Sequence, residues 1–366
     1  MILIVEPTYK EVTFWTYKES GSGHSPRSII KSTEEIETKP DLTKTINTIT
    51  GNTLPKAISI RILFGGELFG KTALVDDNFF PAFEKLIKIR PSYISFILTF
   101  IKDLYEAFPD VHILAFFETG LFLELPEVEK CYAMPDNYYG EISYRKWGFH
   151  GIWHDYNAGI PAKPQKTISI VLDKTTTVCA LSKKSPVTMS FGSTPLEGIM
   201  GKKSCGDIDP GIVFYLMKKN NYSIQKMDEI LKNKSGFFGL TGYDKEMDEL
   251  VKMYGNDPKV DLAFEVYMNQ IKKYIGESIA MLGGVSDIIF SGPYVEAFKP
   301  IIFNILKDIS FIDITLDALP WENADKLSKI SLKNSKVSVF LNKVTIPEII
   351  FKMTKDYRAK HLEVFA

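Results

Sequence analysis

The sequence predicts an α/β protein made of two similar lobes around a cleft. The chain has 366 residues, which is too long for one compact core of typical size, so we expect two domains. Each half opens with a pair of segments rich in β-forming residues, at 2–17 and at 167–181. Helical and strand patterns alternate after each pair, and this alternation is typical of α/β folds.

The first half begins with a predicted β-hairpin. Ile2–Val5 is an apolar run and Val12–Tyr17 alternates, so the turn of the hairpin lies around Glu6–Glu11. The polar stretch Glu19–Thr53 predicts a loop with irregular strands. The other elements predicted here are a buried strand at Ala57–Phe64, two helices within Phe79–Phe108 that Pro91 interrupts, and a strand at Val111–Phe117.

The second half opens with a comparable hairpin, in which 173–175 joins two strands at 167–172 and 176–181. We place one lobe at 1–148, completed by a C-terminal helix at 347–366, and the other lobe at 149–346. The elements predicted after this hairpin are helices at Pro210–Lys219, Ser223–Lys232, Val260–Leu282, Ala297–Lys307 and Pro347–Lys355, and strands at Ser286–Phe290 and Val337–Leu341.

Composition and charge exclude several classes of function. Lys and Arg number 44 against 45 Asp and Glu, so the net charge favours neither nucleic acid nor an anionic membrane as a partner. Cys131, Cys179 and Cys205 are scattered, which fits neither a disulfide framework nor a zinc knuckle. Residues 1–30 lack the pattern of a secretory signal, and no run of about 18 apolar residues is present. We expect a cytoplasmic protein.

Two segments carry a resemblance to a known family. Trp147–His154 reads WGFHGIWH, and Ser190–Pro210 reads SFGSTPLEGIMGKKSCGDIDP. Together with IRILFGGELF at Ile60–Phe69 and LKNKSGFFGLTG at 231–242, they stand in the order found in the acetate kinase family. The sequence therefore resembles acetate kinase and its propionate and butyrate relatives, weakly over most of the chain and most specifically over 144–240.

The resemblance implies two actin-like (ribonuclease H-like) lobes and an ATP-dependent carboxylate kinase that uses Mg²⁺. The chemical difficulty in such an enzyme is charge, because a carboxylate anion must approach an anionic phosphoryl group. Arginine, histidine and a metal ion around the transferred group reduce this repulsion and stabilise the transition state.

Seven residues match positions of the family. By resemblance, Arg61 grips a carboxylate or phosphate, His150 contacts the transferred phosphoryl group, and Glu118 stands in for a catalytic aspartate. His154 is the family's second histidine and has a more structural role. The apolar wall that receives the acyl methyl group is matched by Leu63, Phe149 and Pro195.

Each of these residues also has a plain structural interpretation. Arg61 on its own favours a surface ion pair, and His150 beside an aromatic residue is often a packed, hydrogen-bonded histidine. Glu118 can merely cap a strand. Asp209 and Pro210 have the pattern of a helix start, with Asp as the N-cap residue and Pro at the first helical position.

The loops that bind the nucleotide in the family differ here. The first hairpin normally carries Asn-x-Gly-Ser-Ser-Ser and then Lys, but 6–13 contains no glycine, two added carboxylates and Pro7, which lacks an N–H donor. The second hairpin normally reads His-Leu-Gly-Asn-Gly, whereas 171–175 reads VLDKT. Other departures are Tyr93 for a histidine, Ser204 for an arginine that Lys202 or Lys203 replaces in part, Asp248 for an arginine, GPYVE at 292–296 and IPE at 346–348.

Three hypotheses follow. The first is a kinase-like protein with weak or no ordinary ATP-dependent activity, acting as a binding or structural module in a homodimer or larger complex. The alternative is an active acetate or short-chain carboxylate kinase with an altered phosphodonor or substrate. The third is a protein that holds a small anion at Arg61 and His150 without phosphoryl transfer. The partner is then a small carboxylate or an acyl phosphate. The cofactor stays open, since only the resemblance implies ATP and Mg²⁺, and no metal ligand is assigned.

Overall fold

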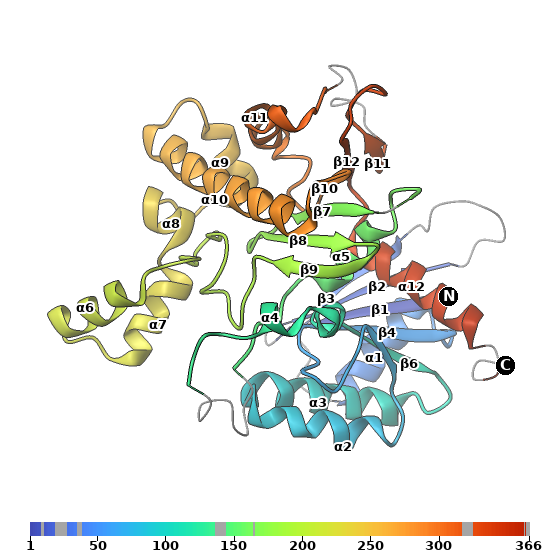
Figure 1. Ribbon diagram of the computed structural model, residues 1–366. Helices are drawn as coiled ribbons and strands as arrows, with labels where there is room; N and C mark the ends of the chain where they lie inside the picture. Colours follow the sequence, from blue (N-terminus) through green and yellow to red (C-terminus); the bar gives the residue numbers. More distant parts are fainter. Residues whose placement is uncertain are drawn as a thin grey trace. The chain divides into compact units, whose positions relative to one another are not determined.

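The computed structural model describes residues 1–8, 11–18, 28–34, 39–135, 144–163, 165–316, 325–361 and 363 (Figure 1). The chain divides into two compact units. The described residues of the first unit lie within Met1–Leu123 and Thr345–Ala366, and those of the second lie within Glu124–Pro135 and Tyr144–Val344. The C-terminal segment therefore belongs to the unit that the N-terminus begins. None of the described helices is long and apolar enough to cross a membrane.

The first unit contains a six-stranded mixed sheet with the order β3-β2-β1-β4-β6-β5. β1 and β4 are parallel, as are β4 and β6, whereas the pairs β1–β2, β2–β3 and β5–β6 are antiparallel. The N-terminal hairpin is present as predicted, with Ile2 opposite Tyr17 and Pro7 opposite Val12. The strands are β1 Ile2–Pro7, β2 Val12–Tyr17, β3 Ser28–Glu34, β4 Ala57–Ile62, β5 Thr72–Leu74 and β6 Ile113–Phe117.

The C-terminal helix α12 (Ile346–Lys360) covers part of this sheet. It packs on β1 and β4 (Figure 1), and the buried hydroxyls of Ser59 and Thr354 lie 2.7 Å apart across that contact. Pro91 begins a helix, as its fixed φ angle allows at the first helical position. The other helices of this part of the chain are α1 Lys39–Thr50, α2 Phe79–Glu84, α3 Pro91–Ala107 and the 3₁₀ helices η1 Lys85–Lys88 and η2 Gly120–Glu124.

Helix α1 lies in the polar stretch 19–53, so the prediction of a loop with irregular strands is wrong for this part. Leu42, Ile46 and Ile49 recur at helical spacing and are 1%, 0% and 8% exposed. Threonine, lysine and asparagine fill the positions between them, and these residues hide the helical period in the sequence. Strand β3 also lies in this stretch, while residues 19–27 lie outside the described part of the chain.

The second unit contains another six-stranded mixed sheet, with the order β11-β12-β10-β7-β8-β9. β7 and β10 are parallel, as are β10 and β12, whereas β7–β8, β8–β9 and β11–β12 are antiparallel. The hairpin predicted at 167–181 is therefore formed. The strands are β7 Lys166–Val171, β8 Thr177–Ser182, β9 Ser185–Met189, β10 Asp287–Ser291, β11 Leu327–Lys329 and β12 Ser338–Asn342.

The long helix α10 (Pro258–Leu282) organises the core of the second unit. It packs on β8, β9 and β7 and on a short helix, α8 (Figure 1). Phe237, Phe264, Tyr267 and Phe298 are at most 1% exposed and contact one another with their rings. The other helices here are α4 Glu127–Lys130, α5 Gly151–Ala158, α6 Pro210–Asn220, α7 Ile224–Asn233, α8 Gly236–Thr241, α9 Met247–Met253, α11 Lys299–Asp308 and the 3₁₀ helix η4 Ser310–Ile312.

The two sheets have the same topology. The order β3-β2-β1-β4-β6-β5 becomes β9-β8-β7-β10-β12-β11 when six is added to each strand number, and each pair keeps its parallel or antiparallel sense. The α/β class and the two similar units that the sequence predicts are therefore confirmed.

Candidate functional site

Arg61 and Glu118 lie side by side in the first unit. Arg61 is on β4 and Glu118 directly follows β6, and these strands are parallel neighbours with Arg61 opposite Phe116. The Arg61 Nε atom donates to Glu118 Oε1 at 2.5 Å, and Arg61 Nη1 lies 3.3 Å from Oε1 of Glu6. Glu118 is fully buried, whereas the side chains of Arg61 and Glu6 are 18% and 20% exposed.

This cluster places two carboxylates around one guanidinium group. The buried charge of Glu118 needs a partner, because an unpaired carboxylate away from water is costly, and Arg61 supplies it through charge-assisted hydrogen bonds. Glu6 then adds a second negative charge at the edge of the cluster. An anionic ligand that approaches Arg61 must displace Glu6 or accept repulsion from it.

Leu63 belongs to the same unit and is 39% exposed. Its backbone N–H donates to the hydroxyl of Tyr93 on α3 at 2.7 Å. Tyr93 stands where the family resemblance predicts a histidine, and here its hydroxyl fixes the backbone that follows β4. Phe149 and Pro195, the other two residues assigned to the apolar wall, belong to the second unit.

His150 begins helix α5 in the second unit and is fully buried. Its backbone is left-handed, with φ 61° and ψ 27°, which is uncommon for a residue other than glycine. The ring Nδ1 atom lies 2.9 Å from the Thr177 hydroxyl, which is on β8. The Nε2 atom lies 3.4 Å from Oδ2 of Asp173, within the range of an ion pair but without hydrogen-bond geometry to any described residue.

His154 lies one helical turn after His150 and shares its partner. Its Nε2 atom is 2.9 Å from the Thr177 hydroxyl, and its Nδ1 atom is 2.7 Å from the Ser169 hydroxyl. Burial lowers the pKa of His154 well below its ordinary value, and the neighbouring His150 lowers it further. His154 is therefore neutral at physiological pH.

The other two apolar residues have different surroundings. The ring of Phe149 packs on His150 with 4.3 Å between ring centroids and on Phe191 with 5.4 Å. Pro195 lies in the loop of the STPLEG motif and lines a pocket together with Thr175 and Ser204. Phe149 thus packs against the buried His150, while Pro195 lines the pocket.

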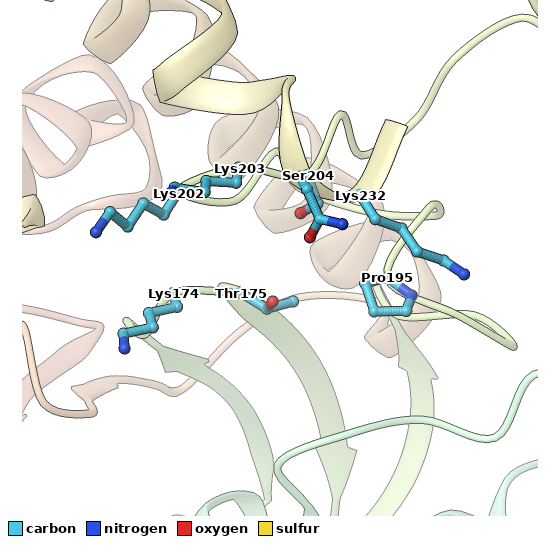
Figure 2. Close-up of a pocket in the computed structure, with 8 residues that line it drawn as sticks. Lys174, Thr175, Pro195, Lys202, Lys203, Ser204 and Lys232 are labelled. Atoms are coloured by element: carbon cyan, nitrogen blue, oxygen red, sulfur yellow. The ribbon is translucent and has the colours of Figure 1, made fainter. Parts of the chain in front are cut away.

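That pocket has a volume of about 500 Å³ and is lined largely by lysines. Figure 2 shows Lys174 and Thr175 facing Lys202, Lys203 and Ser204, with Pro195 and Lys232 at one end. We call it the lysine pocket, and its lining consists of Lys174, Thr175, Pro195, Lys202, Lys203, Ser204, Lys232 and Asn233.

Most of these lysines already have carboxylate partners. Lys202 lies 2.7 Å from Glu246, Lys203 lies 2.8 Å from Asp244, and Lys232 lies 2.5 Å from Asp228. The Lys174 ammonium group has no carboxylate partner within the described part of the chain. The positive charge of the pocket is therefore partly neutralised by these carboxylates.

The hairpin turns that would hold a nucleotide use their donors internally. The backbone N–H of Thr8 donates to the carbonyl of Glu11 at 2.9 Å, and that of Lys174 donates to Oδ1 of Asp173 at 2.6 Å. Tyr9 and Lys10, in the turn between β1 and β2, lie outside the described residues. The carboxylate of Asp173 therefore occupies the N–H of Lys174 in the second hairpin.

The segment at 346–348, where the sequence departs from the family's pattern, has a structural use. Glu348 forms a capping box with Thr345 at the start of α12, accepting from the Thr345 N–H at 2.9 Å and from its hydroxyl at 3.0 Å. Within the described ranges, no group of three or more His, Cys, Asp or Glu side chains is placed to hold a metal ion.

Thr177 and Lys232 escape the sequence analysis. A threonine in a run of three threonines carries no chemical signature, and only the pairing of β7 with β8 brings Thr177 to His150. Lys232 is one of many lysines on a charged helix. One signal was available: His150, His154 and Asn157 are spaced at i, i+4 and i+7, which places them on one face of a helix.

Comparisons with known proteins agree on one family. The model of the acetokinase family matches residues 17–350. The chain is 31% identical over 295 residues to the acetate kinase of Halothermothrix orenii, covering 78% of this chain and 74% of that protein. It is 30% identical over 314 residues to the acetate kinase of Clostridium novyi, covering 83% of this chain and 78% of that one.

Solved structures show the same fold. The Porphyromonas gingivalis acetate kinase superimposes with a TM-score of 0.87 at 22% identity, over 97% of this chain and 98% of that chain. A propionate kinase of Francisella tularensis superimposes with a TM-score of 0.82 at 20% identity, over 95% and 97% of the two chains. The two-domain actin-like fold that the sequence resemblance implies is therefore confirmed.

Proposed function

The chain belongs to the acetokinase family, and we propose that it is an acetate kinase-like protein with weak or no ordinary ATP-dependent kinase activity. Acyl phosphate formation in such a protein requires fixed positive or N–H groups around a phosphoryl group that carries negative charge. The groups assigned to this task by position are Arg61 and His150. Both have a carboxylate beside them that the family motifs do not predict.

The observation that carries the proposal is the carboxylate of Asp173, 3.4 Å from His150 Nε2. Its place in the second hairpin corresponds to a glycine in the family's motif. A negative charge at this distance opposes the arrival of a phosphoryl oxygen at the same nitrogen atom. Loss of one transition-state donor commonly costs about 10²–10³ in rate.

Glu6 supports the same conclusion at Arg61. Its carboxylate replaces the asparagine of the family's first hairpin and lies 3.3 Å from Arg61 Nη1. The guanidinium of Arg61 is therefore shared between two carboxylates, Glu118 and Glu6, in a region where the reaction requires anion binding.

An acyl phosphate assay tests this proposal. Full-length protein is incubated with ATP, Mg²⁺ and acetate or propionate, and acyl phosphate is trapped with hydroxylamine. The acetate kinase of Porphyromonas gingivalis serves as the positive control. We expect turnover at least about 10²-fold below the control, because a transition-state contact at His150 is opposed by Asp173. Turnover within tenfold of the control, from folded protein, would overturn the proposal.

The lysine pocket favours a second candidate function, a carboxylate kinase with an altered phosphodonor. Lys174 supplies a cation without a close ion pair to any described carboxylate next to Thr175, and a compact polyphosphate needs fewer loop contacts than ATP. Replacing ATP–Mg²⁺ with pyrophosphate in the same assay distinguishes the two functions. Pyrophosphate-dependent turnover that Lys174→Ala lowers and Lys336→Ala leaves unchanged would support this candidate, whereas no turnover with either donor would reject it.

A third use of the site is to hold a small carboxylate without phosphoryl transfer. Its support is the guanidinium of Arg61, which is 18% exposed and matches planar carboxylates in geometry. Acetate should then raise the melting temperature of the protein, and Arg61→Ala should abolish that rise. A rise that persists in the variant would contradict this use.

A further inference from the structure

A chain of buried polar side chains connects the end of β12 to His150. Each member lies within hydrogen-bond distance of the next, and each is fully buried. We call this chain the relay, and its members are Asn342, Asn157, Ser169, His154, Thr177 and His150.

Which group donates in each hydrogen bond of the relay is decided at the Asn342 end by a backbone N–H. The N–H of Val344 donates to Oδ1 of Asn342 at 3.0 Å. A backbone N–H can only donate, so the oxygen of this amide faces Val344 and its Nδ2 group faces Asn157. Asn342 Nδ2 then donates to Oδ1 of Asn157 at 2.8 Å. Turning either amide round would set two donors against each other.

The next step passes through two hydroxyl groups. Asn157 Nδ2 donates to Ser169 Oγ at 2.9 Å and to Ser291 Oγ at 2.8 Å. Ser291 uses its own proton on the carbonyl of Ile170 at 3.3 Å. Ser169, which accepts from Asn157, has its proton available for Nδ1 of His154 at 2.7 Å.

That contact fixes the proton of His154. The ring is neutral because burial lowers its pKa, and its Nδ1 atom accepts, so its proton lies on Nε2. His154 Nε2 donates to Thr177 Oγ1 at 2.9 Å. The Thr177 hydroxyl accepts from His154 and donates its single proton to Nδ1 of His150 at 2.9 Å.

The opposite direction is unfavourable at both ends. It would require His154 Nδ1 to donate to Ser169, whose own proton would then lack an acceptor among its described contacts, at a cost of about 1–3 kcal/mol for a buried group. It would also present the bare Nε2 lone pair of His150 to the carboxylate of Asp173 at 3.4 Å.

We propose that, in the neutral form of the His150 imidazole, the relay holds the ring proton on Nε2, with Thr177, His154 and Asn157 as positioning residues for this N–H group. The Nε2–H makes no hydrogen bond to the described residues, although it lies 3.4 Å from Asp173 Oδ2. It is therefore a preset donor for an oxyanion that takes the place of that carboxylate. This inference goes beyond the proposed function, since it holds whether or not the site turns over.

Nitrogen NMR of the full-length protein tests the proposal. With ¹⁵N-labelled histidine, the protonated and bare nitrogens of a neutral imidazole have separate chemical shifts, and long-range correlations connect both to the ring protons. The chain contains five histidines, and His150→Gln and His154→Gln assign the two signals. We expect both rings to carry their proton on Nε2 at alkaline pH. A wild-type spectrum that places the proton on Nδ1 of His150 would by itself overturn the proposal.

Variants of the relay separate positioning from a general structural role. Thr177→Val removes the hydroxyl and should convert His150 to a mixture of the two tautomers, while Thr177→Ser should restore the wild-type spectrum. Thr188→Val is the matched control, because its buried hydroxyl on β9 donates to Glu129 at 2.7 Å and Glu277 at 2.9 Å, outside the relay, and it should leave His150 unchanged.

If Thr177→Val does not fold, Ser169→Ala tests the same point one step further along the relay. Without the Ser169 hydroxyl, His154 should become a mixture of the two tautomers. Because His154 then no longer fixes the proton of Thr177, His150 should become a mixture as well. A His150 spectrum that is identical in wild type and in a folded relay variant would contradict the positioning role. The acyl phosphate assay and this experiment are independent, so either proposal can fail alone.

Discussion

Asp173 and Glu6 are the two residues whose charges bear most directly on the proposed function. Each places a carboxylate beside a group that would otherwise attract an anion, His150 in one unit and Arg61 in the other. Neither effect depends on a change of fold. The proposal can therefore be tested by single substitutions that alter charge and little else.

Asp173→Asn removes a negative charge 3.4 Å from His150 Nε2 while keeping an oxygen that can accept from the Lys174 N–H. We expect inorganic phosphate to bind the variant at least about tenfold more tightly, a change of about 1.4 kcal/mol. Isothermal titration measures this affinity. Asp313→Asn, an exposed carboxylate paired with Lys336, is the control and should bind like wild type. Equal affinities in all three proteins would contradict the role given to Asp173.

Arg61→Met tests the buried ion pair with Glu118. The substitution removes the guanidinium from a carboxylate that is 0% exposed, and breaking such a pair typically costs about 3–5 kcal/mol. Urea denaturation should show a loss of this size in the free energy of unfolding. The double variant Arg61→Met/Glu118→Leu should recover most of it, because no buried charge remains. An unaltered midpoint in the single variant would show that Glu118 does not depend on Arg61.

At the element scale, helix α5 and strands β7, β8 and β12 bring the relay together. The spacing of the two histidines is visible in the sequence, but their partners Thr177 and Ser169 lie on β8 and β7, and Asn157 is contacted by Asn342, 185 residues away. Local patterns predict both hairpins and helix α10, whose N-cap Asp257, Pro258 and terminal Gly283 are standard boundary signals. They do not predict helix α1, because polar residues hide its period.

The candidate site is predictable from sequence only in part, because contacts between distant segments depend on how the strands pair. Family motifs single out Arg61, Glu118 and His150, and β4 and β6 do bring the first two together. The carboxylate departures at Glu6 and Asp173 are also visible in the sequence. What they contact, and the whole of the Thr177–Ser169–Asn157 path, depends on strand register, which no single-sequence pattern specifies.

Burial of His154 on α5 predicts a pH dependence of stability. Its pKa lies well below 6.5 in the folded protein because of desolvation, whereas the unfolded chain titrates near 6.5. Below pH 6.5 the unfolded state binds one more proton, so stability falls as the pH decreases, by up to about 1.4 kcal/mol per pH unit. Urea denaturation between pH 5 and pH 8 checks this slope. His154→Gln should reduce it, and equal slopes in the two proteins would refute the assignment.

At the scale of the whole molecule, two units of identical sheet topology are joined so that the last helix belongs to the first unit. In α12, Ile346, Ile349, Ile350 and Phe351 are at most 6% exposed. The N-terminal unit is thus incomplete without the C-terminal residues. Each half of the fold begins with a hairpin, and in this chain both hairpins carry carboxylates.

A chain that ends at Val344 tests the dependence of the first unit on α12. Each buried side chain of this helix contributes about 1.5–3 kcal/mol, and their sum is comparable to the stability of a whole domain. Hydrogen exchange in β1 and β4 should therefore become fast in the truncated protein. A chain that ends at Lys360 retains the helix and should keep its protection. Slow exchange in both truncated proteins would contradict this account.

The most direct test of the central claim is calorimetric titration of ATP–Mg²⁺ into the full-length protein and into the double variant Glu6→Asn/Asp173→Gly. The account predicts no measurable binding to wild type at millimolar nucleotide and measurable binding to the variant, because both carboxylates beside the anion-binding groups are removed. Tight binding of ATP–Mg²⁺ to the wild-type protein, with acyl phosphate turnover in the usual enzyme range of about 1–10³ s⁻¹, would contradict it.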